Sequence, residues 1–406
     1  MDLQDRKRYA ETLIELLSLQ EGQGLFIKGD PEGWDLMSTV AEVAYRAGAR
    51  HVVVEADSPS LVRARLDHSH EQYLTEVPAT YAATRQVYMD EGWAVISFQG
   101  SSDPDLFATV DAGRLGAHEQ AYAEASTPFR RALQQNQQQW IVAPSPTAKW
   151  AAQVVGEANA DALWEILKPV LRLDSDDPAS AWRARRAEIE GRSAQLNKNP
   201  PRRLHFRGPG TDFVVGLTTR SRFIGGGVQT NGGIRFMPNI PTEEVFTAPD
   251  RRIAEGRVRV TRPVRVFERS VHGAWFEFKD GAVVDFGADY GKEMLQQFLD
   301  VDEGARRIGE LALVDTASPV FKSGKVFSSI LLDENAASHI ALGAAYPACI
   351  EGHTSLGHDE LQAMGVNVGS KVHRDFMIGS DEVDVEAEYA DGTGAVLMKK
   401  GEFVGM

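Results

Sequence analysis

The sequence predicts an α/β N-terminal domain with a mostly parallel sheet, followed by a strand-rich α+β C-terminal domain. In the first half, short apolar runs alternate with stretches of helical periodicity. After Pro201 the pattern changes to short alternating runs joined by turns that contain Gly and Asp. The helix-breaking stretch at 197–201 separates the two patterns, so we predict domains 1–197 and 198–406 in this chain of 406 residues.

The predicted elements of the N-terminal half alternate along the chain. Residues 5–19 and 33–47 carry apolar side chains at the spacing of amphipathic helices. The predicted strands, each a short apolar run between helical stretches, are residues 25–27, 51–55, 93–97 and 140–143. The run at 51–55 contains three consecutive valines and is typical of a buried strand. No Walker A sequence and no Gly-x-Gly-x-x-Gly stands at a strand-to-helix turn, which argues against a nucleotide-binding domain.

A long helix is predicted at 176–195, just before the break. It carries four arginines, namely Arg183, Arg185, Arg186 and Arg192. Glu188 and Glu190 are interleaved with them. This mixture of charges favours a solvated helix face, and an anion site is the alternative.

The C-terminal half is predicted to be rich in strands. Its short alternating runs are residues 212–217, 258–261, 275–278 and 283–286. Glycines cluster at 225–227 and 232–233, where tight turns between strands are favoured over a cradle for a ligand backbone. An α+β or barrel-like domain follows from this pattern.

Composition limits the classes of function. The 43 Lys and Arg against 58 Asp and Glu give a formal net charge of −15, which disfavours nucleic acid and anionic membranes as partners. No apolar run reaches ~18 residues, and the N-terminus lacks the apolar core of a signal peptide, so we expect a cytoplasmic location. The single cysteine, Cys349, excludes an internal disulfide framework and a zinc site built from several thiolates. Any metal site would therefore use His and carboxylates.

Two segments of the C-terminal half supply glutamates. In 239–249 (Asn-Ile-Pro-Thr-Glu-Glu-Val-Phe-Thr-Ala-Pro), two prolines restrict the backbone around paired carboxylates, and alone this favours a rigid turn with exposed acids. Glu310 lies near the start of the apolar run 308–314. Its burial would require a partner or a metal, whereas the solvent end of a strand is the alternative.

Two further segments supply histidines. If 334–346 is helical, seven residues at 100° each bring Tyr346 to within about 20° of His339 on one face, and a core His and Tyr with satisfied hydrogen bonds is the alternative. If 371–379 is a strand, His373 and Asp375 point to the same side. Imidazole with carboxylate suits a divalent cation of the first transition row. Together the four segments supply enough ligands for two adjacent metal ions.

These segments resemble the M29 family of metallo-aminopeptidases, the aminopeptidase T type. The resemblance rests on the sequence at 239–249, Gly-Glu at 309–310, Asp-Glu-Asn-Ala-Ala-Ser-His at 333–339 with Tyr346 following, and His-Arg-Asp-Phe-Met-Ile-Gly at 373–379. The order and approximate separations of the motifs are similar across the C-terminal half. The N-terminal α/β half is compatible with the family.

The resemblance implies a metal-dependent aminopeptidase that hydrolyses the N-terminal peptide bond of peptides through a metal-activated water. The resemblance implies two bound divalent ions, and Zn, Co, Mn or Mg are the candidates. Their implied ligands are Glu244, Glu310, His339, His373 and Asp375. Glu243 is not included in this set. Tyr346 is implied as the residue that hydrogen-bonds the developing oxyanion, and Glu310 is the candidate acceptor of the water's proton. The family also implies a homodimer that encloses an internal chamber for peptides with a free N-terminus.

Two other functions stay open. Ring-cleaving dioxygenases for dihydroxypyridines belong to the same fold family and use one iron held by two His and an Asp, which His339, His373 and Asp375 would satisfy. The additional carboxylates Glu244 and Glu310 argue for two metals instead. The other alternative is a non-catalytic peptide-binding relative, although no ligand is missing from the sequence.

The remaining histidines are less informative. His353 and His358 lie in a Gly-rich loop, where exposure is favoured over a lining role in the site. His68 and His70 are predicted to lie on the surface.

Overall fold

The computed structural model describes residues 1–100, 106–107, 109–267 and 269–405, which form two compact units. The first unit comprises residues 1–183 and 227–241, and the second comprises 184–226 and 242–406. The division by packing therefore falls inside helix α9 (Pro178–Lys198). Among the described residues, no helix is long and apolar enough to cross a membrane.

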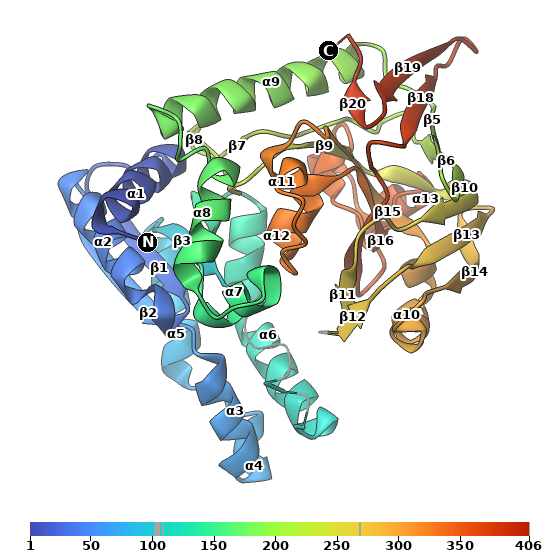
Figure 1. Cartoon of the computed structure of the whole chain (residues 1–406). Helices are drawn as coiled ribbons and strands as arrows, with labels where there is room; N and C mark the ends of the chain where they lie inside the picture. Colours follow the sequence, from blue (N-terminus) through green and yellow to red (C-terminus); the bar gives the residue numbers. More distant parts are fainter. Residues whose placement is uncertain (101–105, 108, 268, 406) are drawn as a thin grey trace. The chain divides into compact units, whose positions relative to one another are not determined.

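The first unit is built on a parallel sheet, as the alternation of helices and strands predicts (Figure 1). The strand order is β2-β1-β3-β4, and every adjacent pair is parallel. The strands are β1 (Gly24–Gly29), β2 (His51–Ala56), β3 (Ala94–Gln99) and β4 (Trp140–Pro144), with the short β7 (Val228–Gln229) and β8 (Arg235–Phe236). The helices are α1 (Leu3–Leu17), α2 (Trp34–Arg46), α3 (Pro59–His68), α4 (Glu71–Leu74), α5 (Ala79–Asp90), α6 (Ala112–Gln134), α7 (Ala148–Val155) and α8 (Ala160–Val170).

Strand β2 corrects one prediction, because it is not buried. Its residues are exposed or half-buried, and the side chain of Val53 is 37% exposed. The strand forms an edge of the sheet and pairs there with β1. A run of valines is equally compatible with an edge strand and a central strand, so the sequence pattern alone did not distinguish the two.

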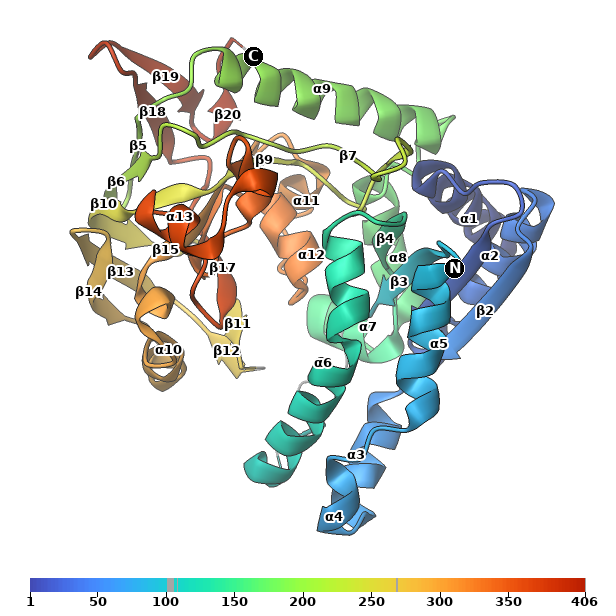
Figure 2. The ribbon, with the colours of Figure 1, turned by 180° about the vertical axis from the view of Figure 1, so that it is seen from behind.

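The second unit contains an eight-stranded and a four-stranded antiparallel sheet, shown from two sides in Figures 1 and 2. The larger sheet has the order β14-β13-β10-β6-β5-β18-β19-β20. Its strands are β5 (Arg203–Gly208), β6 (Thr211–Leu217), β10 (Pro249–Arg259), β13 (Trp275–Lys279), β14 (Ala282–Gly287), β18 (Asp384–Glu388), β19 (Gly394–Lys399) and β20 (Glu402–Phe403). The smaller sheet has the order β17-β16-β15-β9, and its strands are β9 (Glu244–Thr247), β15 (Ile308–Val314), β16 (His339–Gly343) and β17 (His373–Met377).

Short elements complete this unit. They are the hairpin strands β11 (Val264–Val266) and β12 (Arg269–Val271), the helices α10 (Lys292–Leu299), α11 (Pro319–Lys322), α12 (Ile330–Asp333) and α13 (His358–Ala363), and the 3₁₀ turns η2 (Glu303–Arg306), η3 (Glu334–Ala336), η4 (Pro347–Cys349) and η5 (His353–Ser355). The predicted strands at 212–217, 275–278 and 283–286 correspond to β6, β13 and β14. The prediction at 258–261 is only partly right, because β10 ends at Arg259.

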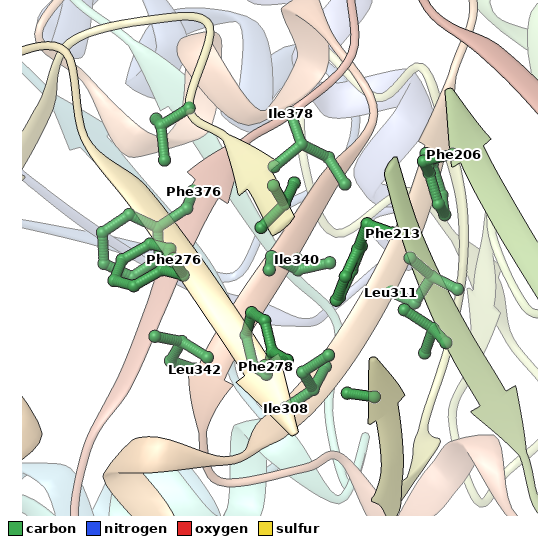
Figure 3. Close-up of a cluster of buried hydrophobic side chains, with 14 of the residues drawn as sticks. Phe206, Phe213, Phe276, Phe278, Ile308, Leu311, Ile340, Leu342, Phe376 and Ile378 are labelled. Atoms are coloured by element: carbon green, nitrogen blue, oxygen red, sulfur yellow. The ribbon is translucent and has the colours of Figure 1, made fainter. Parts of the chain in front are cut away.

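The core of the second unit lies between its sheets, where aromatic side chains of the larger sheet meet aliphatic side chains and Phe376 of the smaller one (Figure 3). Phe276 of β13 packs edge-on against Phe376 of β17, with ring centroids 4.9 Å apart. Leu311 and Ile340 belong to the same cluster. Successive side chains on a strand point to opposite faces of the sheet. One face of the smaller sheet therefore packs into the core, and the other face points away from it.

Candidate metal centre

The face of the smaller sheet that points away from this core collects the His and carboxylate side chains. Glu310 of β15 and Asp375 of β17 both stand opposite Ala341 of the central strand β16. On the same face, His339 stands opposite Ala312, and His373 stands opposite Gly343. Small residues thus lie between the polar ones, which leaves room for their side chains to converge above the sheet.

Glu310 has one carboxylate oxygen directed to each of two histidines. Its Oε1 lies 3.7 Å from Nε2 of His339, and its Oε2 lies 3.9 Å from Nε2 of His373. Glu244, the first residue of β9, brings Oε2 to 3.3 Å from the same nitrogen of His339. One donor atom from each of Glu244, Glu310 and His339 lies within 4.8 Å of the others. This spacing fits oxygen and nitrogen atoms arranged around a common cation.

Both histidines have their second nitrogen fixed by the backbone. Nδ1 of His339 is 3.1 Å from the carbonyl oxygen of Ala337, and Nδ1 of His373 is 2.7 Å from that of Ala344. A carbonyl only accepts hydrogen bonds, so each Nδ1 carries a proton and donates. Nε2 of both rings therefore faces the carboxylates, which is the orientation of a metal-binding imidazole whose other nitrogen is held by an outer partner.

The carboxylates and imidazoles change one another's protonation. Burial alone would lower the pKa of His339, but Glu244 and Glu310 raise it well above its ordinary value. Burial also opposes the charge of His373, yet Asp375 and Glu310 raise its pKa to about 9. Burial would raise the pKa of Asp375, but the hydrogen bond from His373 lowers it below its ordinary value. Burial raises the pKa of Glu310, although its contact with His339 opposes the shift.

The chemistry of the His and carboxylate side chains fits divalent cations. Oε2 of Glu244 is buried and accepts no hydrogen bond of acceptable geometry from the described residues. Glu310 and Asp375 are also buried, and a cluster of buried carboxylates is costly unless cations balance it. Imidazole nitrogen with carboxylate oxygen suits zinc and its neighbours in the first transition row.

Glu334 is a further acidic residue near the centre that the sequence analysis did not single out. It lies in η3, five residues before His339. Burial raises its pKa well above the ordinary value, and the nearby charges of Glu244 and Asp375 raise it further. The sequence signal that could have identified Glu334 is its position in the Asp-Glu-Asn-Ala-Ala-Ser-His motif, which ends at His339.

The predicted pairing of His339 and Tyr346 on one helix is wrong. His339–Gly343 is strand β16, and Tyr346 follows it in a loop. The ring of Tyr346 lies 5.1 Å from that of His373 and 6.4 Å from that of Phe246, measured between centroids. Tyr346 is therefore beside the candidate metal centre, where it contacts residues of β17 and β9, and its side chain is half-exposed.

Two expectations about charged side chains are also wrong. Glu243 is buried and not exposed, and its Oε2 accepts a 2.7 Å hydrogen bond from Nε of Arg185. Arg185 and Arg192 do not lie on a solvated helix face, because their side chains are only 10% and 13% exposed. Arg192 pairs instead with the buried Asp315 at 3.2 Å.

The other histidines considered in the sequence make contacts of their own or are exposed. Nδ1 of His353 is 3.2 Å from the carbonyl oxygen of Ile350, and His358 is exposed beside Asp359. His68 and His70 are exposed, as the sequence predicts.

The geometry agrees with comparisons to known proteins. The family model described as thermophilic metalloprotease (M29) matches residues 3–403. The chain is 37% identical over 401 residues to aminopeptidase 2 of Geobacillus stearothermophilus, covering 98% of this chain and 97% of that protein. It is 39% identical over 402 residues to aminopeptidase T of Thermus aquaticus, covering 98% of each.

Solved structures also share the fold of this chain. Wild-type AmpT from Thermus thermophilus superposes with a TM-score of 0.91 at 38% identity, covering 99% of each chain. The 2,5-dihydroxypyridine dioxygenase of Pseudomonas putida KT2440 superposes with a TM-score of 0.51 at 13% identity, covering 100% of this chain and 99% of that one, a likeness of fold alone. The chain belongs to the M29 family of metalloproteases.

Proposed function

We propose that this metallo-aminopeptidase holds two divalent ions between Glu244, Glu310, His339, His373 and Asp375, with Glu334 as an additional carboxylate ligand. The observation that carries the proposal is the position of Glu310, whose two oxygens lie 3.7 Å and 3.9 Å from different histidines. A carboxylate in that position would be suited to help hold both cations. Each of the two histidines, with Nε2 near a different oxygen of Glu310, would supply a nitrogen ligand.

When bound, divalent ions polarise a carbonyl group and lower the pKa of water into the neutral range. The roles of the chain's own residues follow from their positions. A carboxylate of the centre, for which Glu310 is our candidate, takes the proton of the attacking water and passes it to the leaving amine. The hydroxyl of Tyr346 donates a hydrogen bond to the oxygen of the scissile carbonyl as negative charge develops there.

The substrate class follows from the family. The relatives named above are aminopeptidases, so we propose peptides with a free N-terminus as substrates. A homodimer with an internal chamber, a cytoplasmic location and the domain limits 1–197 and 198–406 remain predictions. Measurement of the mass in solution, fractionation of cells and limited proteolysis, respectively, would test them.

The dioxygenase alternative needs only His339, His373 and Asp375. Glu244 and Glu310 both contact His339, although neither belongs to that triad. These additional carboxylates support the peptidase. Metal analysis separates the two functions, because a dioxygenase would contain about one iron per chain and release no amino acid from dipeptides.

The direct test uses metal-depleted protein reconstituted separately with Zn²⁺, Co²⁺, Mn²⁺ and Mg²⁺. We expect at least one ion to restore cleavage of dipeptides and amino-acid anilides. N-acetylated versions of the same substrates are the matched control, and they should not be cleaved because they lack the free amine. Equal cleavage of acetylated and free substrates would refute an aminopeptidase.

A further inference from the structure

Asn335 connects two segments that approach the metal centre from different parts of the chain. Its side chain is buried, with 1% of the residue exposed. Its Oδ1 accepts a 2.6 Å hydrogen bond from the backbone N–H of Glu243, which directly precedes Glu244. Its Nδ2 donates a 2.8 Å hydrogen bond to the carbonyl oxygen of Leu331, in the short helix α12. One amide group therefore links the start of β9 to the turn that carries Glu334.

The position of Asn335 in sequence makes this link relevant to both carboxylates. Asn335 directly follows Glu334, and its hydrogen-bond partner Glu243 directly precedes Glu244. A displacement of the Asn335 side chain would therefore shift the backbone of both Glu334 and Glu244, because each is one peptide bond away from a residue in this link. The carbonyl oxygen of Asn335 also accepts a 2.8 Å hydrogen bond from Oγ of Ser318, which fixes the backbone of the same residue.

The Glu243 end of the link is anchored a second time. Its side chain is buried and bonds Nε of Arg185 on α9 at 2.7 Å. Glu243 is thus held through its backbone N–H by Asn335 and through its carboxylate by Arg185. Since side chains alternate along an extended segment, this anchor directs the side chain of Glu244 away from Arg185 and toward His339.

We infer that Asn335 is a positioning residue that sets Glu244 and Glu334 at the separation that a bound cation requires. The inference rests on the metal centre proposed above. Among the described residues, both hydrogen bonds of the Asn335 side chain go to backbone groups, so Asn335 acts through the two glutamates. Outer partners of this kind typically change metal affinity by about 10- to 100-fold when they are removed.

The test is the affinity of the full-length, metal-depleted chain for Zn²⁺, measured by competition with a chromogenic chelator. Asn335→Ala should bind Zn²⁺ about 10- to 100-fold more weakly than the unaltered chain. Asn197→Ala is the matched control, because the Asn197 amide also bonds two backbone groups, the N–H and C=O of Phe223, at 2.8 and 2.7 Å. The control should lose stability but keep its Zn²⁺ affinity.

A second variant covers the case in which Asn335→Ala does not fold. Asn335→Asp keeps the size of the side chain and the acceptor for Glu243, but it loses the donor to Leu331. An added negative charge near the centre would by itself strengthen Zn²⁺ binding, whereas loss of positioning weakens it, so the sign of the change is decisive. Weaker binding by Asn335→Asp supports the inference, and equal or tighter binding contradicts it.

The outcomes separate this inference from the proposed function. If the unaltered chain binds no Zn²⁺, the metal centre itself is wrong. If the unaltered chain binds Zn²⁺ and folded Asn335→Ala binds it equally well, the centre stands and the role of Asn335 is wrong. Peptidase assays at limiting and at saturating Zn²⁺ provide a second readout. The turnover that Asn335→Ala loses at limiting Zn²⁺ should largely return at saturating Zn²⁺.

Discussion

Nε2 of His373 lies 3.3 Å from Oδ1 of Asp375, two residues along the same strand. The contact arises because alternate residues of β17 point to one face of the sheet. With Asp375 and Glu310 as neighbours, the imidazole retains its proton against the effect of burial, and its pKa rises to about 9. A cation that binds Nε2 must displace that proton.

Metal affinity should therefore rise with pH. Below about pH 9 His373 is protonated in the metal-free protein, so Zn²⁺ binding releases at least one proton, and the affinity should increase at least about tenfold per pH unit. Calorimetry in buffers of different ionisation enthalpy counts the protons released. His373→Ala should release about one fewer, while His358→Ala, altered at an exposed histidine outside the centre, should match the unaltered chain. An affinity independent of pH would contradict the proposed ligand role of His373.

Glu310→Gln tests the carboxylate between the histidines. The amide keeps the shape of the side chain but can neither accept the water's proton nor supply a full negative charge, so turnover should fall by at least about 100-fold. The change in KM should be much smaller. Assays at saturating metal, with the bound metal measured in parallel, separate loss of the base from loss of the ion. Unchanged turnover would exclude Glu310 from the proton transfer.

Glu334→Gln is the comparison that separates base from ligand. If Glu334 only binds metal, the variant should bind Zn²⁺ more weakly and regain turnover at saturating metal. If turnover stays low with metal fully bound, Glu334 is the proton acceptor and Glu310 would act only as a metal ligand.

Tyr346→Phe tests the proposed oxyanion donor. Loss of one such hydrogen bond typically lowers kcat by about 10²- to 10³-fold. The phenyl ring preserves the packing on His373 and Phe246, so Zn²⁺ affinity and KM should change little. Tyr290→Phe, at an exposed tyrosine that packs on His272, is the control and should keep full activity. A normal kcat in Tyr346→Phe would leave the tyrosine without a catalytic role.

Local periodicity predicted the parts of the site that depend on near neighbours. The two-residue spacing of His373 and Asp375 was sufficient to predict that they share a face, because a strand determines side-chain direction locally. The segment around His339 was harder to interpret. Its small residues, including Ala336, Ala337 and Ala341, are compatible with a helix, and only the pairing of β16 with β15 and β17 makes it a strand.

Sequence patterns did not predict contacts between segments that are far apart in the chain. Glu334 was not identified because the helical interpretation of its segment did not bring it toward Glu244, 90 residues away in sequence. Arg185 has glutamates near it in sequence, and these favoured a solvated face. Its buried partner Glu243 is 58 residues away, and no periodicity within α9 reveals that contact.

The Arg185–Glu243 pair gives the last prediction, which concerns stability. Arg185→Met removes the guanidinium from a carboxylate that is itself buried, and breaking a buried pair on one side typically costs about 3 to 5 kcal/mol. Arg183→Met is the matched control on the same helix, because Arg183 pairs with Glu15 in an exposed position and such pairs contribute about 1 kcal/mol or less. Urea unfolding of the metal-free proteins should show a clearly lower midpoint for Arg185→Met than for Arg183→Met. Adding Glu243→Gln to Arg185→Met should recover part of the loss, since no buried charge then remains at that position. Equal midpoints for the two single variants would mean that the buried pair contributes no more than the exposed one.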